Sequence, residues 1–104
     1  MEAALWYVLT GTRGGTNRAR ILRAIHDRPQ NANRLAERLD LDYKTVRHHL
    51  DVLQDNGIVT VGGEDYGAVY LPSERVRQEW AVVERIFVTV AENDSGFDYA
   101  PNPN

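Results

Sequence analysis

Apolar residues recur every three or four positions along much of this chain, the spacing that places side chains on one face of an α-helix. Ile21, Leu22 and Ile25 form the first such stripe, and Pro29 follows it closely. Because proline cannot continue a helix, the stripe belongs to a helix that ends just before it. The pattern predicts a helix over about residues 16–27 that buries these three apolar side chains.

Two more helical patterns follow with almost no chain between them, one over residues 31–39 and the next over residues 43–56. The expected buried positions are Leu35, Ala36 and Leu39 in the first helix and Val46, Leu50 and Leu53 in the second. Two amphipathic helices joined by only three residues, Asp40 to Asp42, cannot lie antiparallel with full overlap. They must cross steeply, which predicts helix-turn-helix geometry.

The residues at the ends of these two helices agree with that prediction. Asn31 and Asp42 cap helix N-termini well, because their side-chain oxygens accept hydrogen bonds from the first free amides. Asp40 stands in the turn, where a left-handed conformation is often required and where Asp is tolerated better than most residues. Gly57 supplies a left-handed stop after the second helix.

After Gly57, the segments IVTV and AVYL are short and apolar, with several β-branched residues, and residues 62–67 (GGEDYG) separate them. Two such runs around a glycine-rich turn predict a β-hairpin. Glu64 and Asp65 make its tip acidic, so phosphates of a nucleic acid would repel it. Tyr66 is the neutral candidate for a contact at the tip.

Residues 73–92 have the pattern of a long helix, with Ser73 as its cap. The apolar stripe on this helix has the alternating spacing of a heptad seam. It consists of Val76, Trp80, Val83, Phe87 and Val90. We expect this seam, together with Leu5 and Trp6, to form a homodimer interface. The alternative is that the same stripe packs against its own domain.

Both ends of the chain are expected to lie outside a central domain of residues 16–72. Residues 1–9 are apolar and compatible with a helix, and the glycine-rich segment TGTRGGT that follows breaks regular structure. Residues 1–15 are therefore expected to form an N-terminal arm and joint. From residue 93 onward the composition is that of a frayed tail, so residues 93–104 are expected to be flexible.

The charges are distributed unevenly along the chain. Residues 11–50 contain nine basic side chains and four acidic ones, whereas the remainder contains three basic and eleven acidic ones. The formal net charge of -3 therefore conceals a basic region on an acidic body. A basic face is what the recognition of phosphates requires, although a solvated run of charge is the simpler interpretation.

The chain contains no cysteine, which excludes disulfides, thiolate zinc sites and cysteine redox switches. Its longest apolar run near the start, Leu5 to Leu9, is too short for a signal peptide or a membrane span, so we expect a cytoplasmic protein without membrane contact. Lys44 is the only lysine, beside eleven arginines. This balance is typical of proteins from salt-loving archaea, although a GC-rich genome produces it as well.

The order of helix, helix-turn-helix, hairpin and long helix resembles the winged helix-turn-helix domain of ArsR-type transcriptional regulators, particularly small halophilic archaeal members. The resemblance covers about residues 16–85 and is closest in NRLAERLDLDYKTVRHHLDVLQDNGIV. It implies a mainly α fold with a small β-hairpin and a long C-terminal dimerisation helix. It also implies a homodimer on double-stranded DNA, with the second helix of the motif in the major groove and the hairpin, or wing, near the minor groove.

Metal sensing does not carry over from that family. Several members bind metal through cysteines near the recognition helix or through His and carboxylates on the terminal helix, but residues 73–92 contain no His. His48 and His49 point about 100° apart on a helix and cannot share one ion, and His26 lies on another element. The chain also lacks a nucleophile motif, a recognisable catalytic carboxylate pair and a complete phosphate loop, so we expect neither an enzyme nor a cofactor.

Residues 43–56 are the expected recognition helix, because their N-terminal half turns polar side chains away from the buried stripe. The expected DNA contacts are Tyr43, Lys44, Thr45, Arg47 and His48 on this helix and Arg34 and Arg38 on the preceding one. Arg47 is the best candidate for two hydrogen bonds to a guanine, whereas Arg34 and Arg38 suit the DNA backbone. His49 tilts towards the core and is expected to be packed and hydrogen-bonded.

Arg13, Arg18 and Arg20 are weaker candidates for contacts to flanking phosphates. Together these residues favour a homodimeric, sequence-specific DNA-binding transcription regulator. The alternative is a winged-helix module whose basic face docks an acidic protein partner.

Overall fold

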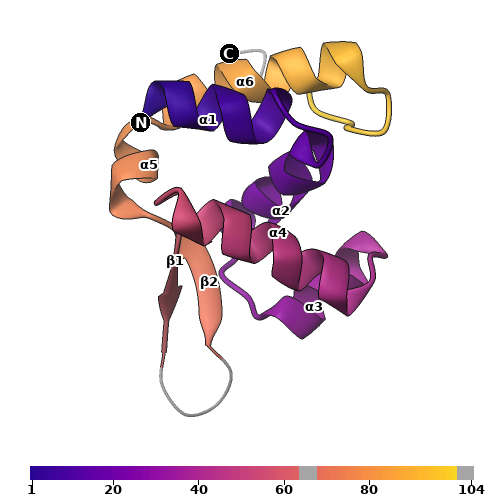
Figure 1. The fold of residues 1–104 in the computed structure, drawn as a ribbon, viewed down its shortest axis with the longest axis vertical. Helices are drawn as coiled ribbons and strands as arrows, with labels where there is room; N and C mark the ends of the chain where they lie inside the picture. The colour runs from indigo at the N-terminus through magenta and orange to yellow at the C-terminus, as the bar shows by residue number, and fades with distance from the viewer. Residues whose placement is uncertain (64–67, 101–104) are drawn as a thin grey trace.

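The computed structural model describes residues 1–63 and 68–100, which form helices and one antiparallel pair of strands (Figure 1). In chain order the elements are α1 (Glu2–Thr10), α2 (Gly15–Asp27), α3 (Ala32–Leu39), α4 (Tyr43–Asp55), β1 (Val59–Gly62), β2 (Val69–Pro72), α5 (Glu74–Gln78) and α6 (Trp80–Asn93). The helices α1 and α6 lie at one end of the molecule, and the hairpin of β1 and β2 projects from the other (Figure 1).

Helix α2 runs through the centre of the fold and packs against α1, α3, α4, α6 and β2. Its apolar stripe is responsible, because Ile21, Leu22 and Ile25 are completely buried. The predicted helix is confirmed, although it begins at Gly15, slightly earlier than expected. A helix so enclosed fixes the relative positions of the elements around it.

The pair α3 and α4 has the predicted helix-turn-helix geometry. Asp40 adopts the left-handed conformation between them, with φ of 55°. The Asn31 side chain accepts a hydrogen bond from the backbone amide of Arg34, and the Asp42 side chain accepts one from the amide of Lys44. Both predicted caps are thus confirmed, and they begin the two helices at defined residues.

The chain leaves α4 through Gly57, whose φ of 70° confirms the expected left-handed stop. The buried Ile58 then leads into the hairpin, in which Val59 pairs with Pro72 and Gly62 pairs with Val69. This is a winged helix-turn-helix fold, mainly helical with one small hairpin as its wing. The predicted tip of the hairpin, with the acidic Glu64 and Asp65 and the neutral Tyr66, lies outside the described residues.

The N-terminal segment is an integral helix rather than the expected arm. Leu5, Val8 and Leu9 of α1 are buried against α2 and α6, and they belong to the same core as the helix-turn-helix. The physical reason is that α3, α4 and the hairpin cover only part of the surface of α2. The helices α1 and α6 cover another part of that surface. None of the described helices has the length and apolar character needed to cross a membrane.

The C-terminal region also differs from the prediction in two respects. The single helix expected over residues 73–92 is divided at Glu79 into α5 and α6, although Ser73 caps α5 as expected. Part of the segment expected to be a flexible tail packs on the fold instead. Phe97 is buried, and its ring centroid lies 5.3 Å from that of Phe87. The ring of Tyr99 also contacts that of Phe87. Aromatic packing thus holds this segment against α6, which composition alone did not reveal.

Candidate nucleic-acid interface

Helix α4 is attached to the fold by one face and presents the other to solvent. Val46, Leu50 and Leu53 are completely buried, as the apolar stripe predicts. On the opposite side, the side chains of Lys44 and His48 are exposed. Because the buried stripe fixes the rotation of the helix, the polar side chains of its outer face have a defined direction.

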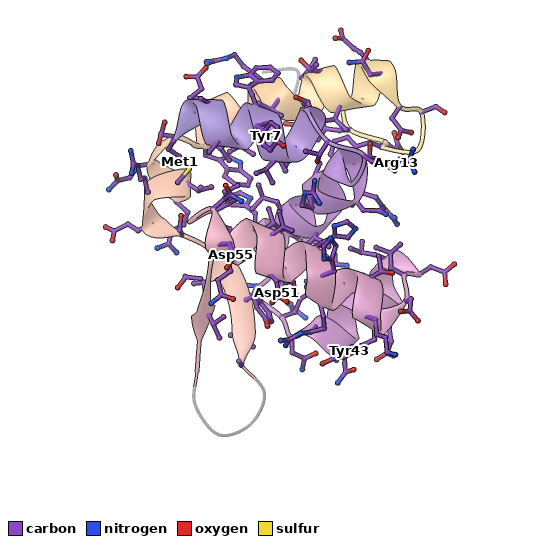
Figure 2. All side chains as sticks on the ribbon, viewed as in Figure 1. Met1, Tyr7, Arg13, Tyr43, Asp51 and Asp55 are labelled. Atoms are coloured by element: carbon purple, nitrogen blue, oxygen red, sulfur yellow. The ribbon has the colours of Figure 1, made fainter. Side chains whose placement is uncertain are left out.

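The remaining predicted contacts of α4 lie beside these residues. Tyr43 is 44% exposed, Arg47 is exposed and Thr45 is half-buried. Tyr43 stands at the start of the helix, and Asp51 and Asp55 follow towards the base of the wing (Figure 2). The N-terminal half therefore carries the cationic groups and the C-terminal half the carboxylates, an arrangement that favours an anion at the N-terminal half only.

Arg47 is held in place by the wing. Its Nη1 atom donates a hydrogen bond of 3.0 Å to the phenol oxygen of Tyr70 on β2. A shallow hollow of about 170 Å³ lies around this pair. It is lined by Asn31, Ala32, Asn33, Tyr43, Arg47, Ala68 and Tyr70. The hollow brings the starts of α3 and α4 together with the wing, three segments that are separate in the sequence.

Arg34 and Arg38 are both exposed on α3, one helical turn apart. Arg38 donates to Asp27 at 3.1 Å in an ion pair whose side chains are 47% and 68% exposed. Such solvent-exposed pairs contribute little free energy, so Arg38 can exchange this carboxylate for another anion at small cost.

Two of the weaker candidates have structural roles instead. Arg18 is buried, with only 5% of its surface exposed, and its Nε atom donates to the Val8 carbonyl at 3.0 Å. Arg20 donates to the Leu39 carbonyl at the end of α3. The proposal that these two arginines contact flanking phosphates is therefore wrong for Arg18 and is weakened for Arg20, whereas Arg13 is exposed.

His49 is buried and hydrogen-bonded, which confirms the expectation from the helical wheel. The Nη1 atom of Arg18 lies 3.1 Å from Nδ1 of His49, and a further hydrogen bond joins Arg18 to the hydroxyl of Thr12. Burial lowers the pKa of His49 to about 4, and the positive charges of Arg18 and His48 act in the same direction. His49 is therefore neutral at pH 7, with Nδ1 accepting the hydrogen bond from Arg18.

The residues expected at a dimer interface fall into two groups, buried and half-buried. Leu5, Val76, Val83, Phe87 and Val90 are buried within the chain itself. For these five the alternative interpretation, packing on their own domain, describes their positions. Trp6 and Trp80 are half-buried, and the ring of Trp80 stacks on that of His26 with centroids 3.7 Å apart.

Tyr7, which was not among the residues predicted for the interface, is 64% exposed on α1 and is the most exposed of the large hydrophobic side chains described. In Figure 2 it lies well away from Tyr43 and the start of α4. Its signal in the sequence is its position in the run from Leu5 to Leu9, where it falls between the buried residues of the helix. Tyr7 leaves α1 with an apolar group on its outer face.

Residues 17–62 match a protein family described as a helix-turn-helix domain. The match includes α3, α4, most of α2 and the first strand of the wing. No curated protein matches the chain. A helix-turn-helix domain of this kind suggests a DNA-binding regulator and is typically not an enzyme. Among residues 1–63 and 68–100, no three His, Asp or Glu side chains gather in a way that could hold a metal ion.

Proposed function

We propose that the protein is a sequence-specific, DNA-binding transcription regulator that acts as a homodimer and inserts α4 (Tyr43–Asp55) into the major groove of double-stranded DNA. The observation that carries this proposal is the orientation of α4. Val46, Leu50, Leu53 and His49 are buried. Lys44, Arg47 and His48 are exposed together near its N-terminal end.

Each exposed group has a chemical role in this proposal. The Arg47 guanidinium reads the O6 and N7 atoms of a guanine, because its planar set of donors matches that edge. Lys44 and His48 read purine edges or contact phosphates, while Tyr43 and Thr45 contact a phosphate or a thymine methyl group. Asp51 and Asp55 remain outside the groove, since phosphates repel them.

Arg34 and Arg38 contact the DNA backbone in this proposal. Both are exposed on α3, the helix that precedes α4, so they would lie near the DNA backbone beside the major groove. Such contacts set the position of the domain on the duplex and contribute affinity without reading sequence. Arg38 leaves Asp27 when it contacts a phosphate.

A second copy of the chain is expected to bind the first through residues that the core leaves exposed. Tyr7 on α1 is the most exposed of these, and Trp6 and Trp80 are partly accessible. Most of the heptad seam expected at the interface is buried within the chain itself and is therefore not accessible to a second copy. A two-fold dimer would present two recognition helices to successive major grooves of a palindromic site.

We further propose an ArsR-like regulator adapted to high salt. The support is the sequence resemblance and the presence of a single lysine, Lys44, among twelve basic residues. At about 1 M salt the screening length is only about 3 Å, so generic attraction to phosphates is weak. Specificity would then depend on close contacts such as that of Arg47 and on DNA shape.

A mobility-shift assay against a library of genomic fragments tests the proposed function. The wild-type protein is expected to retain a few fragments selectively, and Arg47→Ala is expected to lose that selection. The matched control is Arg77→Ala, which removes an exposed arginine on α5. Retention of all fragments to the same weak extent, or of none, would instead indicate a module that docks an acidic protein.

A further inference from the structure

We infer that Tyr70 is a positioning residue for base recognition: its phenol holds the Arg47 guanidinium in the orientation in which the remaining donors read the DNA. This inference rests on the proposed function. It is carried by the 3.0 Å hydrogen bond from Nη1 of Arg47 to the Tyr70 oxygen, which joins the wing to the recognition helix.

Tyr70 is itself held rigidly. Only 5% of its surface is exposed, and its backbone lies in β2, paired with Val61 of β1. On the other edge of β2 its amide donates to the Gln30 carbonyl at 2.9 Å, and its carbonyl accepts from the Gln30 amide at 3.4 Å. The backbone of Tyr70 is therefore held by β1 on one side and by Gln30 on the other, so the position of its phenol oxygen is well defined.

Gln30 extends this support to the centre of the fold. It is buried, and its side-chain amide donates to the carbonyl oxygens of Ala24 and Arg28 at the end of α2. The Arg47 side chain is thus connected through Tyr70 and Gln30 to the helix around which the whole domain packs. A movement of the wing relative to α2 would move the guanidinium as well.

The hydrogen bond leaves Arg47 able to bind DNA. A guanidinium has five N–H donors, and the described contact uses Nη1. The side chain remains exposed and borders the hollow between α3, α4 and the wing. An unrestrained arginine side chain loses conformational entropy when it binds DNA. The hydrogen bond to Tyr70 restricts the Arg47 side chain before binding and so reduces this loss. A phenol is neutral, so it orients the guanidinium without neutralising it, as a carboxylate would.

A double-mutant cycle on a selected operator tests this inference. Affinity is measured for the operator and for a duplex with the Arg47-dependent base pair replaced, using wild type, Tyr70→Phe, Arg47→Ala and the double variant. Tyr70→Phe retains the buried ring and removes only the oxygen. It is expected to reduce discrimination at that base pair by about 3- to 10-fold, the effect of one hydrogen bond. In the Arg47→Ala background the same change should have no effect on discrimination.

Three controls separate the outcomes. Thermal unfolding should show that Tyr70→Phe remains folded, and Leu71→Ala, a change to the half-buried neighbour on β2, should leave discrimination unchanged. If wild type selects an operator but Tyr70→Phe discriminates equally well, or loses the same amount in both backgrounds, the positioning role is wrong. If wild type selects no operator, the proposed function itself fails.

Discussion

The guanidinium of Arg18 on α2 lies 3.1 Å from Nδ1 of His49 on α4, so a buried cation and a buried imidazole join the central helix to α4. Their partners are the Val8 carbonyl and the Thr12 hydroxyl, which bring α1 and the loop after it into the same network. Burial lowers the pKa of Arg18 as well as that of His49. The network therefore depends on the imidazole being neutral.

Stability should decrease on acidification because of His49. Its pKa is about 4 in the fold and about 6.5 when unfolded, so the unfolded chain binds more protons between these values. The free energy of unfolding should thus fall as the pH is lowered from about 6.5 to about 4. The full shift corresponds to about 3 kcal/mol. Because solvent near the network screens part of this charge, we expect a loss of about 1 to 2 kcal/mol from this group, measured by urea unfolding.

The matched variant for that titration is His49→Asn, whose side-chain oxygen can accept the hydrogen bond from Arg18 but does not titrate. Its stability should depend less steeply on pH over the same range than that of the wild type. Equal slopes for the two proteins would show that His49 is not the group responsible.

Gly14→Ala should destabilise the protein because Gly14 lies against this network. A Cβ atom there would lie 2.5 Å from Nη1 of Arg18 and 2.7 Å from Cε1 of His49. Two buried side chains would have to shift, at a cost of about 1 to 3 kcal/mol in the free energy of unfolding. Gly62→Ala is the control, since its nearest contact would be 3.4 Å from Leu71; its unfolding midpoint should change little.

Tyr7→Glu should convert the proposed dimer to monomers, because it places a charge on the exposed face of α1 without entering the core. Sedimentation equilibrium measures the mass, and Gln78→Glu, a change at an exposed position of α5, serves as control. A wild type that is already monomeric would contradict the dimer. A Tyr7→Glu variant that remains dimeric would place the interface elsewhere.

Arg34→Ala should weaken DNA binding about equally for all sequences. If Arg34 contacts a phosphate, its loss should also reduce the slope of log affinity against log salt by about 1. Titrations at several salt concentrations measure this slope, with Arg77→Ala on α5 as control. An unchanged slope would remove Arg34 from the interface.

The helix-turn-helix could be predicted from sequence because local signals determine it. Spacing of apolar residues placed Val46, Leu50 and Leu53 in the core, and short-range hydrogen bonds made Asn31 and Asp42 effective caps. These interactions join residues a few positions apart, so the sequence contains them directly.

The contacts that connect distant segments could not be predicted in this way. Arg47 and Tyr70 are separated by 23 positions, and nothing in either segment indicates that they meet. For Arg18 a signal was present, since it lies one helical turn before Ile21 and Leu22 on the buried stripe. Arg18 was nevertheless predicted to contact phosphates, because an arginine is rarely buried unless it has partners.

If the exposed N-terminal half of α4 reads base edges, Arg47→Ala should remove one of the base preferences of the protein. Binding free energies are measured for the operator and for duplexes that each differ from it at one base pair. Wild type is expected to discriminate at one guanine by about 1 to 3 kcal/mol, and Arg47→Ala is expected to lose this preference while the others persist. An unchanged pattern of preferences in Arg47→Ala would show that this face of α4 does not read bases through Arg47.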